Sequence, residues 1–264
     1  MKRIALVLSL ALPLVVVGQD KKFQGDPKIS PGPNWSGQVV KATGAGAPDM
    51  KATSPAQARL GAERAAQLDA FRNLLAQVKG LQISAGKTMS DAMAKDEIRA
   101  KVEGIVKGFK VTGKRYFSDG GVEVDVEVPL AMLTDVIDPE PAQQQLATKT
   151  DGEKANTGLV IDARGLKVTP ALAPRLLANP DAKVVYSIDS LSPDARKSAG
   201  VASYVQSLED AKKSMKAGEK PLIIKAAEAK GTDIVLAAED LQKLNQTNTS
   251  FLSEGRVIVV MSLN

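Results

Sequence analysis

The sequence contains no cysteine and no histidine. Without cysteine the chain has no disulfide, no thiolate metal ligand and no thiol nucleophile. Without histidine it lacks the commonest general base, the commonest zinc ligand and every Ser-His-Asp arrangement. Catalysis would have to use carboxylate, lysine or tyrosine side chains. We therefore expect a protein that is not an enzyme and that uses no cofactor and no metal.

Aromatic residues are also scarce, with one Trp, three Tyr and five Phe among 264 residues. The formal net charge is +5, and the sequence has no dense run of lysine and arginine. Proteins that bind nucleic acids combine aromatic stacking with a basic stripe that neutralises phosphates. The sequence therefore predicts no nucleic-acid partner and a solvated surface of mixed charge.

The longest apolar run, Ile4–Val17, lies close to the N-terminus. Two basic residues precede it, Pro13 interrupts it and Gly18 follows it, which is the layout of a secretory signal peptide over residues 1–18. The run is shorter than the roughly 20 apolar residues that span a bilayer. We expect a periplasmic or secreted mature chain with no transmembrane span. Because no cysteine follows the run, no lipid anchor is expected.

The rest of the chain divides by composition into a leader, two domains and a linker. Residues 19–34 are polar and carry three prolines, which is typical of a flexible leader. Residues 138–156 contain two prolines and a run of three glutamines, which indicates a linker. Residues 35–137 and 157–264 are then predicted to be two small α+β domains, each with a mixed or antiparallel sheet packed with helices.

The first domain has a clear helix signal. Ser54 and Pro55 are a favourable N-cap and first helical residue, and the helix is expected to run to Lys79 and end at Gly80. A second helix is predicted over Ala92–Lys107. Steps of three and four residues indicate which side chains of the first helix are buried. These are Ala58, Ala62, Ala65, Leu68, Phe71, Leu75 and Val78.

A hairpin follows, because Val111–Phe117 and Gly121–Val128 flank an Asp-Gly turn. In its second strand valines alternate with Glu123, Asp125 and Glu127. The valines are predicted to face the core and the acids to face water. If the protein assembles with a partner, this acidic face is a candidate contact surface.

The second domain has short apolar segments separated by helical candidates at Pro193–Ala199, Ser207–Ala217 and Ala238–Asn245. It is expected to form a mixed sheet with helices on one side. Asp162 and Arg164 follow its first predicted strand and share a face. They either bind a ligand as a carboxylate and a guanidinium, or form an ion pair that fixes a turn before Gly165.

Two sets of segments resemble a known family. The first set is Ala62–Leu75, Gly80–Ile83 and the hairpin ending at Val126–Leu130; the second is Thr157–Leu166, Pro170–Arg175 and Arg256–Val260. Both resemble the bacterial LPP-type envelope lipoproteins, and the first is similar to the N-terminal domain of flagellar assembly protein T. The lipoprotein members carry a lipid on an N-terminal cysteine, which this chain lacks.

The resemblance implies a non-enzymatic protein in the periplasm or peripheral to the outer membrane, and flagellar members contribute to a ring around the basal body. We therefore expect an exported cell-envelope protein that works in binding or assembly, with envelope proteins or a second copy as partner. The alternatives are a periplasmic small-ligand or polysaccharide-binding protein and, third, a secreted hydrolase that uses carboxylates.

Overall fold

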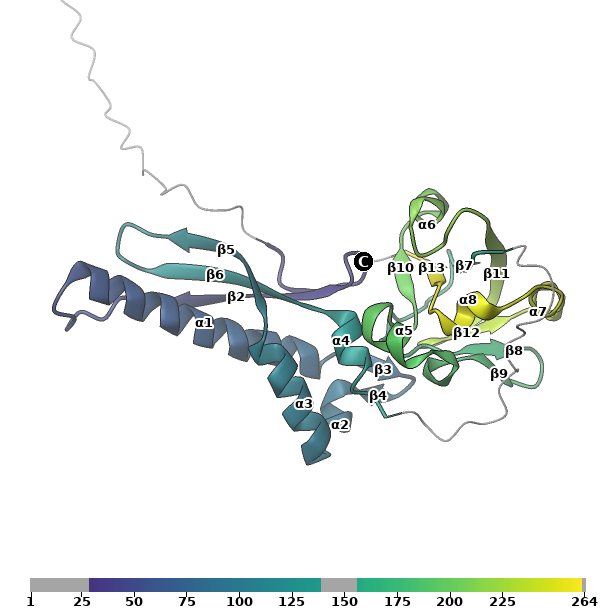
Figure 1. The fold of residues 1–264 in the computed structure, drawn as a ribbon, viewed down its shortest axis with the longest axis horizontal. Helices are drawn as coiled ribbons and strands as arrows, with labels where there is room; N and C mark the ends of the chain where they lie inside the picture. Colours follow the sequence, from purple (N-terminus) through teal and green to yellow (C-terminus); the bar gives the residue numbers. More distant parts are fainter. Residues whose placement is uncertain (1–28, 139–155, 263–264) are drawn as a thin grey trace, which may run out of the picture.

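The computed structural model describes residues 29–138 and 156–262. They form two lobes (Figure 1), the first comprising residues 29–138 and the second residues 156–262. Both lobes contain helices and sheets, which confirms the predicted α+β class. The predicted signal peptide at 1–18, most of the leader at 19–34 and most of the linker at 138–156 lie outside the described residues.

A four-stranded antiparallel sheet in the order β1-β2-β6-β5 forms the base of the first lobe. Its strands are β1 (Gly32–Asn34), β2 (Val39–Gly46), β5 (Lys110–Tyr116) and β6 (Val122–Pro129). The predicted hairpin is β5–β6 and is confirmed. The expected leader is wrong at its end, because β1 pairs with β2 as an edge strand. Pro33 suits an edge strand, where one side of the backbone has no strand neighbour.

Helix α1 (Pro55–Lys79) lies along one face of this sheet and has the predicted bounds (Figure 1). Its N-cap is Ser54, whose hydroxyl oxygen accepts a hydrogen bond from the Gln57 amide at 3.2 Å. Gly80 follows the last helical residue. Local capping chemistry therefore sets the start of the helix, and the helix ends at the predicted residue.

The predicted buried stripe of α1 is confirmed at Ala62 and Val78 and wrong at Ala65 and Leu68, which are exposed; the other three predicted residues are partly buried. The buried side chains are Ala62, Ala66, Ala70, Leu74 and Val78. The helix turns its smallest residues inward because β2 presents glycines there. A Cβ atom on Gly44 would lie 2.0 Å from the Ala70 amide nitrogen, and one on Gly46 would lie 2.0 Å from the Ala62 carbonyl oxygen. Helix and strand backbones thus pack in direct contact.

The remaining elements of the first lobe are short. They are β3 (Gln82–Ser84), β4 (Lys87–Thr88), α2 (Met89–Ala92), α3 (Asp96–Lys107) and α4 (Leu130–Thr134). The second predicted helix therefore begins four residues late, at Asp96. Its first expected residue, Ala92, belongs to α2 instead, which starts at a capping box between Thr88 and Asp91.

The second lobe contains a seven-stranded mixed sheet in the order β10-β13-β7-β11-β12-β8-β9. The strands are β7 (Gly158–Asp162), β8 (Leu176–Ala178), β9 (Val184–Tyr186), β10 (Ser203–Val205), β11 (Pro221–Lys230), β12 (Asp233–Leu236) and β13 (Val257–Val260). The helices are the 3-10 helix η1 (Ile188–Ser190) and α5 (Pro193–Ser198), α6 (Leu208–Lys213), α7 (Ala238–Asn245) and α8 (Ser250–Ser253). Predicted helices at 193, 207 and 238 correspond to α5, α6 and α7.

Both faces of this sheet are covered, so the expectation of helices on one side is wrong. Leu159 and Val259 belong to the main core. Their strand neighbours Val160 and Ile258 point the other way and pack against Ala211 of α6 in a separate cluster. Residues 158–161 of β7 are buried throughout, as expected of a strand covered on both faces.

The two lobes are in direct contact. The amides of Leu172 and Ala173 donate hydrogen bonds to the carbonyls of Gln82 at 2.9 Å and Ile83 at 2.8 Å. Helix α4 of the first lobe also packs against α5 of the second (Figure 1). Within the part of the chain that the structure describes, no helix is both long and apolar enough to cross a membrane.

Candidate functional site

The predicted acidic face of β6 is only partly solvated. Asp125 is 1% exposed, because the Arg115 guanidinium covers its carboxylate and binds both oxygens, one of them at 2.9 Å. Arg115 also donates to Glu123, and the Thr43 hydroxyl donates to Asp125 at 2.7 Å. The hydrogen bond with Asp125 raises the pKa of Arg115. The prediction of an acidic face in water is therefore wrong for Asp125.

The two outer acids are paired with the neighbouring strand β5. Glu123 accepts from Arg115 at 3.0 Å, and Glu127 lies 3.6 Å from the Lys110 ammonium. Both carboxylates are about one-fifth exposed. The three acids thus form a cross-strand ion-pair network in which Arg115 binds two of them and Lys110 pairs with the third.

Asp162 and Arg164, at the end of β7, form a bidentate ion pair. The Arg164 Nε and Nη2 atoms donate to the two Asp162 oxygens at 2.8 and 2.7 Å. The Arg164 amide also donates to Asp162 at 3.2 Å, and Gly165 follows with φ of 82°. These hydrogen bonds from Arg164 lower the pKa of Asp162. The geometry agrees with the interpretation of the pair as a brace for the turn. It lies in the other lobe from the acidic strand, so the structure does not unite the two predicted sites.

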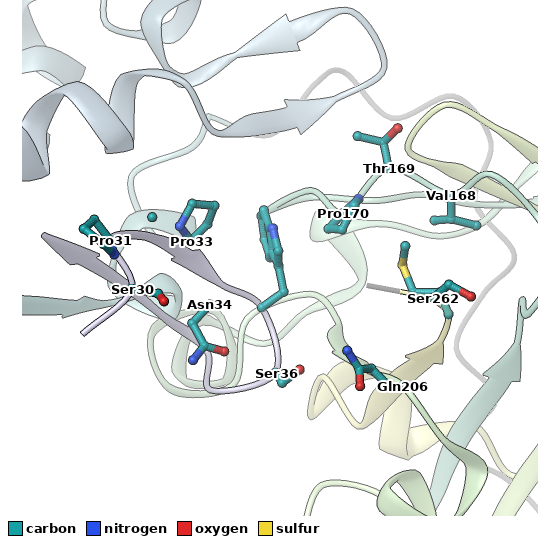
Figure 2. Close-up of a pocket in the computed structure, with 13 residues that line it drawn as sticks. Ser30, Pro31, Pro33, Asn34, Ser36, Val168, Thr169, Pro170, Gln206 and Ser262 are labelled. Atoms are coloured by element: carbon teal, nitrogen blue, oxygen red, sulfur yellow. The ribbon is translucent and has the colours of Figure 1, made fainter. Parts of the chain in front are cut away.

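A groove of about 670 Å³ lies where the lobes meet. We call it the Trp35 groove; it is lined by residues 30–36, residues 168–170, Gln206, Met261 and Ser262. Figure 2 shows Pro33 and Asn34 of the first lobe facing Pro170 and Gln206 of the second across this space. The groove is open to solvent, and none of the described residues that line it is charged.

Trp35 is held in place by the second lobe. Its ring meets that of Tyr204 edge to face, with centroids 5.5 Å apart and planes at 76°. Tyr204 is fully buried, and its hydroxyl both accepts from the amide and donates to the carbonyl of Ala171, each at 3.0 Å. The Gln38 side chain donates to the Trp35 carbonyl. The half-buried indole is therefore pre-positioned at the groove.

A second cleft, of about 460 Å³, also lies between the lobes. We call it the Lys216 cleft; it is lined by Gln38, Pro129, Ala131, Ser198, Ala199, Ser203, Met215, Lys216, Glu254 and Arg256. The Lys216 ammonium donates to the Ala199 carbonyl at 2.9 Å and to the Ser203 hydroxyl at 3.1 Å. Burial lowers the pKa of Lys216 to about 7. Gln38 lines this cleft, and its side chain donates a hydrogen bond to the backbone carbonyl of Trp35, which lines the other cavity.

Metal binding has no support in the described ranges 29–138 and 156–262. They hold no group of three or more Asp, Glu, His or Cys side chains placed to bind one ion. The carboxylates described above are each paired with arginine or lysine, which is a structural use of charge. The two inter-lobe cavities are concave surfaces that a ligand could enter.

The fold and its cavities define a two-lobed α+β protein with two clefts at the lobe junction. Residues 158–263 match the family model of the second domain of Tp0624 from Treponema pallidum. The match runs from the start of β7 past the end of β13, which supports a division of the chain into two domains. No curated protein matches the sequence at a significant level. The resemblance to LPP-type lipoproteins and flagellar assembly protein T stays a prediction.

Sequence reasoning did not identify Trp35 or Lys216 as site residues. Trp35 carried a usable signal, because it is the single tryptophan of the chain and stands beside a proline-rich segment. Lys216 carried none, since its surroundings come from residues 198–203, residues 254–256 and the other lobe. Only the folded chain brings these segments together.

Proposed function

We propose that this is an exported, non-enzymatic protein of the cell envelope that works by binding, and that the Trp35 groove is its binding site. Export is supported by the signal-peptide layout of residues 1–18. A binding role is supported by the absence of histidine and cysteine and by a groove at the lobe junction. The single observation that carries the site is an indole fixed beside an uncharged groove.

The chemistry of the lining favours an uncharged glycan as ligand. The apolar C–H face of a sugar ring packs on an indole, and sugar hydroxyls bond to amides and hydroxyls such as those of Asn34, Ser36 and Gln206. A charged ligand would lose hydration without gaining a counter-charge from the lining. Because the groove is open, a polymer strand can lie along it. The ligand class is thus a neutral segment of envelope polysaccharide.

Co-sedimentation of the mature protein with insoluble envelope glycan tests this proposal. We expect Trp35→Ala to reduce the sedimented fraction strongly and Trp35→Phe to retain much of it, because a phenyl ring keeps an aromatic platform. Phe117→Ala is the matched control, since this aromatic side chain is 47% exposed at the far end of β5. Equal sedimentation of Trp35→Ala and wild type would refute the assignment.

Assembly with a second copy or an envelope protein is the second candidate, and the outer face of α1 favours it. Leu60 and Leu68 are 57% and 51% exposed there. Their spacing of two four-residue steps places them on one side of the helix. Light scattering should give the monomer mass for Leu60→Lys/Leu68→Lys and a larger mass for wild type. A monomeric wild type would reject self-association.

A location at the outer membrane or the flagellar basal body rests on the family resemblance. Crosslinking in intact cells, followed by identification of captured proteins, tests it. Capture of basal-body or outer-membrane components supports that location. Recovery of the protein uncrosslinked from the periplasmic or extracellular fraction argues against it.

A further inference from the structure

The Lys216 cleft has a chemistry different from that of the Trp35 groove. Its three charged side chains are Lys216, Glu254 and Arg256. Glu254 and Arg256 neutralise one another, because the Arg256 Nε atom donates to the Glu254 carboxylate at 2.6 Å. Among the described residues Lys216 forms no ion pair. The cleft therefore carries one uncompensated positive charge whenever Lys216 is protonated.

The Lys216 ammonium is held by two hydrogen bonds and has one further hydrogen to donate. Within residues 29–138 and 156–262 its hydrogen-bond partners are the Ala199 carbonyl and the Ser203 hydroxyl. An ammonium group has three hydrogens to donate, so one remains for a ligand. The Ser203 hydroxyl accepts from Lys216 and keeps its own hydrogen to donate. Two donors thus lie together at the edge of the cleft.

A half-buried cation without a counter-ion is unfavourable, and a bound anion relieves that cost. We propose that the Lys216 cleft is a binding site for a carboxylate, which accepts hydrogen bonds from the Lys216 ammonium and the Ser203 hydroxyl. A carboxylate carries one negative charge, which balances the single uncompensated positive charge of the cleft. A phosphate dianion carries two negative charges, so one of them would stay unbalanced. The Arg256 guanidinium lines the same cleft, but its charge is matched by Glu254. This site does not depend on the proposed glycan groove.

Lys216 binds its ligand as the ammonium, so binding and protonation are coupled. Burial lowers the pKa of Lys216 to about 7. The protonated fraction then falls about tenfold between pH 6 and pH 8, and carboxylate affinity should fall by a similar factor. By the same linkage a bound carboxylate raises the pKa of Lys216. Glu254 and Arg256 are the other charged groups that line the cleft, and they form an ion pair with one another.

Nitrogen-15 NMR of the lysine side chains of the full mature protein tests the proposal. N-acetylglycine represents a peptide C-terminus and glucuronate an acidic sugar; N-acetylglycinamide and glucose are their uncharged controls. We expect one or both carboxylates to move the titration midpoint of the Lys216 signal upward by about one pH unit, and the uncharged controls to leave it in place. Which carboxylate acts identifies its source. An unchanged midpoint with both carboxylates, or an equal shift with the uncharged controls, overturns the proposal.

Two variants complete the test. Lys216→Met should abolish carboxylate binding, and Lys212→Met, at an exposed lysine of α6, should leave it unchanged. If Lys216→Met does not fold, Lys216→Arg can be used to assign the Lys216 side-chain signal, because that signal is missing from its spectrum. The titration of the wild-type protein then still tests the proposal. If the wild-type protein binds carboxylates but does not bind envelope glycan, the proposed function is rejected and this site stands. If it binds envelope glycan but no carboxylate, this site is rejected and the proposed function stands.

Discussion

Replacement of Gly44 by alanine tests how closely helix α1 approaches the sheet. The added Cβ atom would lie 2.0 Å from the Ala70 amide nitrogen and 2.2 Å from the Ala66 carbonyl oxygen. Ordinary contact distances are about 3.5 Å, and both neighbours are backbone atoms of one helix that cannot rotate away. Helix α1 must therefore move outward by about 1 Å or more, a distance that well-packed cores do not absorb easily.

The cost has two parts. Overpacking of this kind destabilises by about 1–3 kcal/mol. The shift also strains two hydrogen bonds from α1 to the edge of β2, in which Asn73 donates to the Thr43 carbonyl and Asp69 accepts from the Ala45 amide, each at 2.9 Å. At about 1 kcal/mol each, their loss brings the expected decrease in the free energy of unfolding to about 3–5 kcal/mol.

Urea denaturation followed by circular dichroism measures this change. Gly61→Ala, on the exposed side of α1, is the matched control because a Cβ atom there meets nothing within 4 Å. It should stabilise the protein by about 0.5–1 kcal/mol, the helix preference of alanine over glycine. A Gly44→Ala variant within about 0.5 kcal/mol of wild type would refute the close packing of helix on strand.

Three further predictions use the same measurement. Arg115→Met should lower the free energy of unfolding by about 3–5 kcal/mol, because it removes the guanidinium that binds both oxygens of the buried Asp125 carboxylate. The same substitution should cost less in the Asp125→Asn background, and an equal cost would contradict this reasoning. Tyr204→Phe should cost about 1–3 kcal/mol by removing both hydrogen bonds to Ala171, and an unchanged stability would contradict the account of the Trp35 platform. Because burial lowers the pKa of Lys216 to about 7, folding releases a proton above that pH and below the unfolded pKa of about 10.4. Wild type should therefore gain stability relative to Lys216→Met as the pH rises from 7 to 10, and parallel curves would contradict this.

The ends of α1 were predictable from sequence and its buried face was not. The Ser54 cap and the Gly80 stop act within a few residues, so local chemistry determines them. The choice of face depends on Gly44 and Gly46, which lie outside the helix. A periodicity argument favours large apolar residues, whereas the two glycines of β2 lie against Ala62, Ala66 and Ala70 and leave room only for small side chains there.

The acidic strand shows how pairing overrides an alternating pattern. Val122 and its even-numbered neighbours are buried as the alternation predicts. Asp125 is buried as well, because β5 pairs with β6 through a shift in register between Val111 and Gly113 and brings Arg115 over its carboxylate. That register is a property of the folded sheet and cannot be read from β6 alone.

The two inter-lobe cavities lay beyond sequence reasoning for a related reason. The Trp35 groove joins residues 30–36 to residues that lie more than 130 positions later. The composition bears only on the proposal, since the absence of histidine and cysteine favours a binding role over catalysis as a hypothesis. Only the packing of the two lobes specifies where a ligand would sit.

The fluorescence of Trp35 tests the central claim most directly, because it is the single tryptophan of the chain and lies in the proposed site. Soluble neutral oligosaccharides released from the envelope are titrated into the mature protein while its emission is recorded. The account predicts a saturable change in intensity and wavelength that is absent with acidic oligosaccharides of equal length. An emission spectrum that stays constant with neutral oligosaccharides, under conditions where the protein still sediments with envelope glycan, would place binding elsewhere and contradict the account.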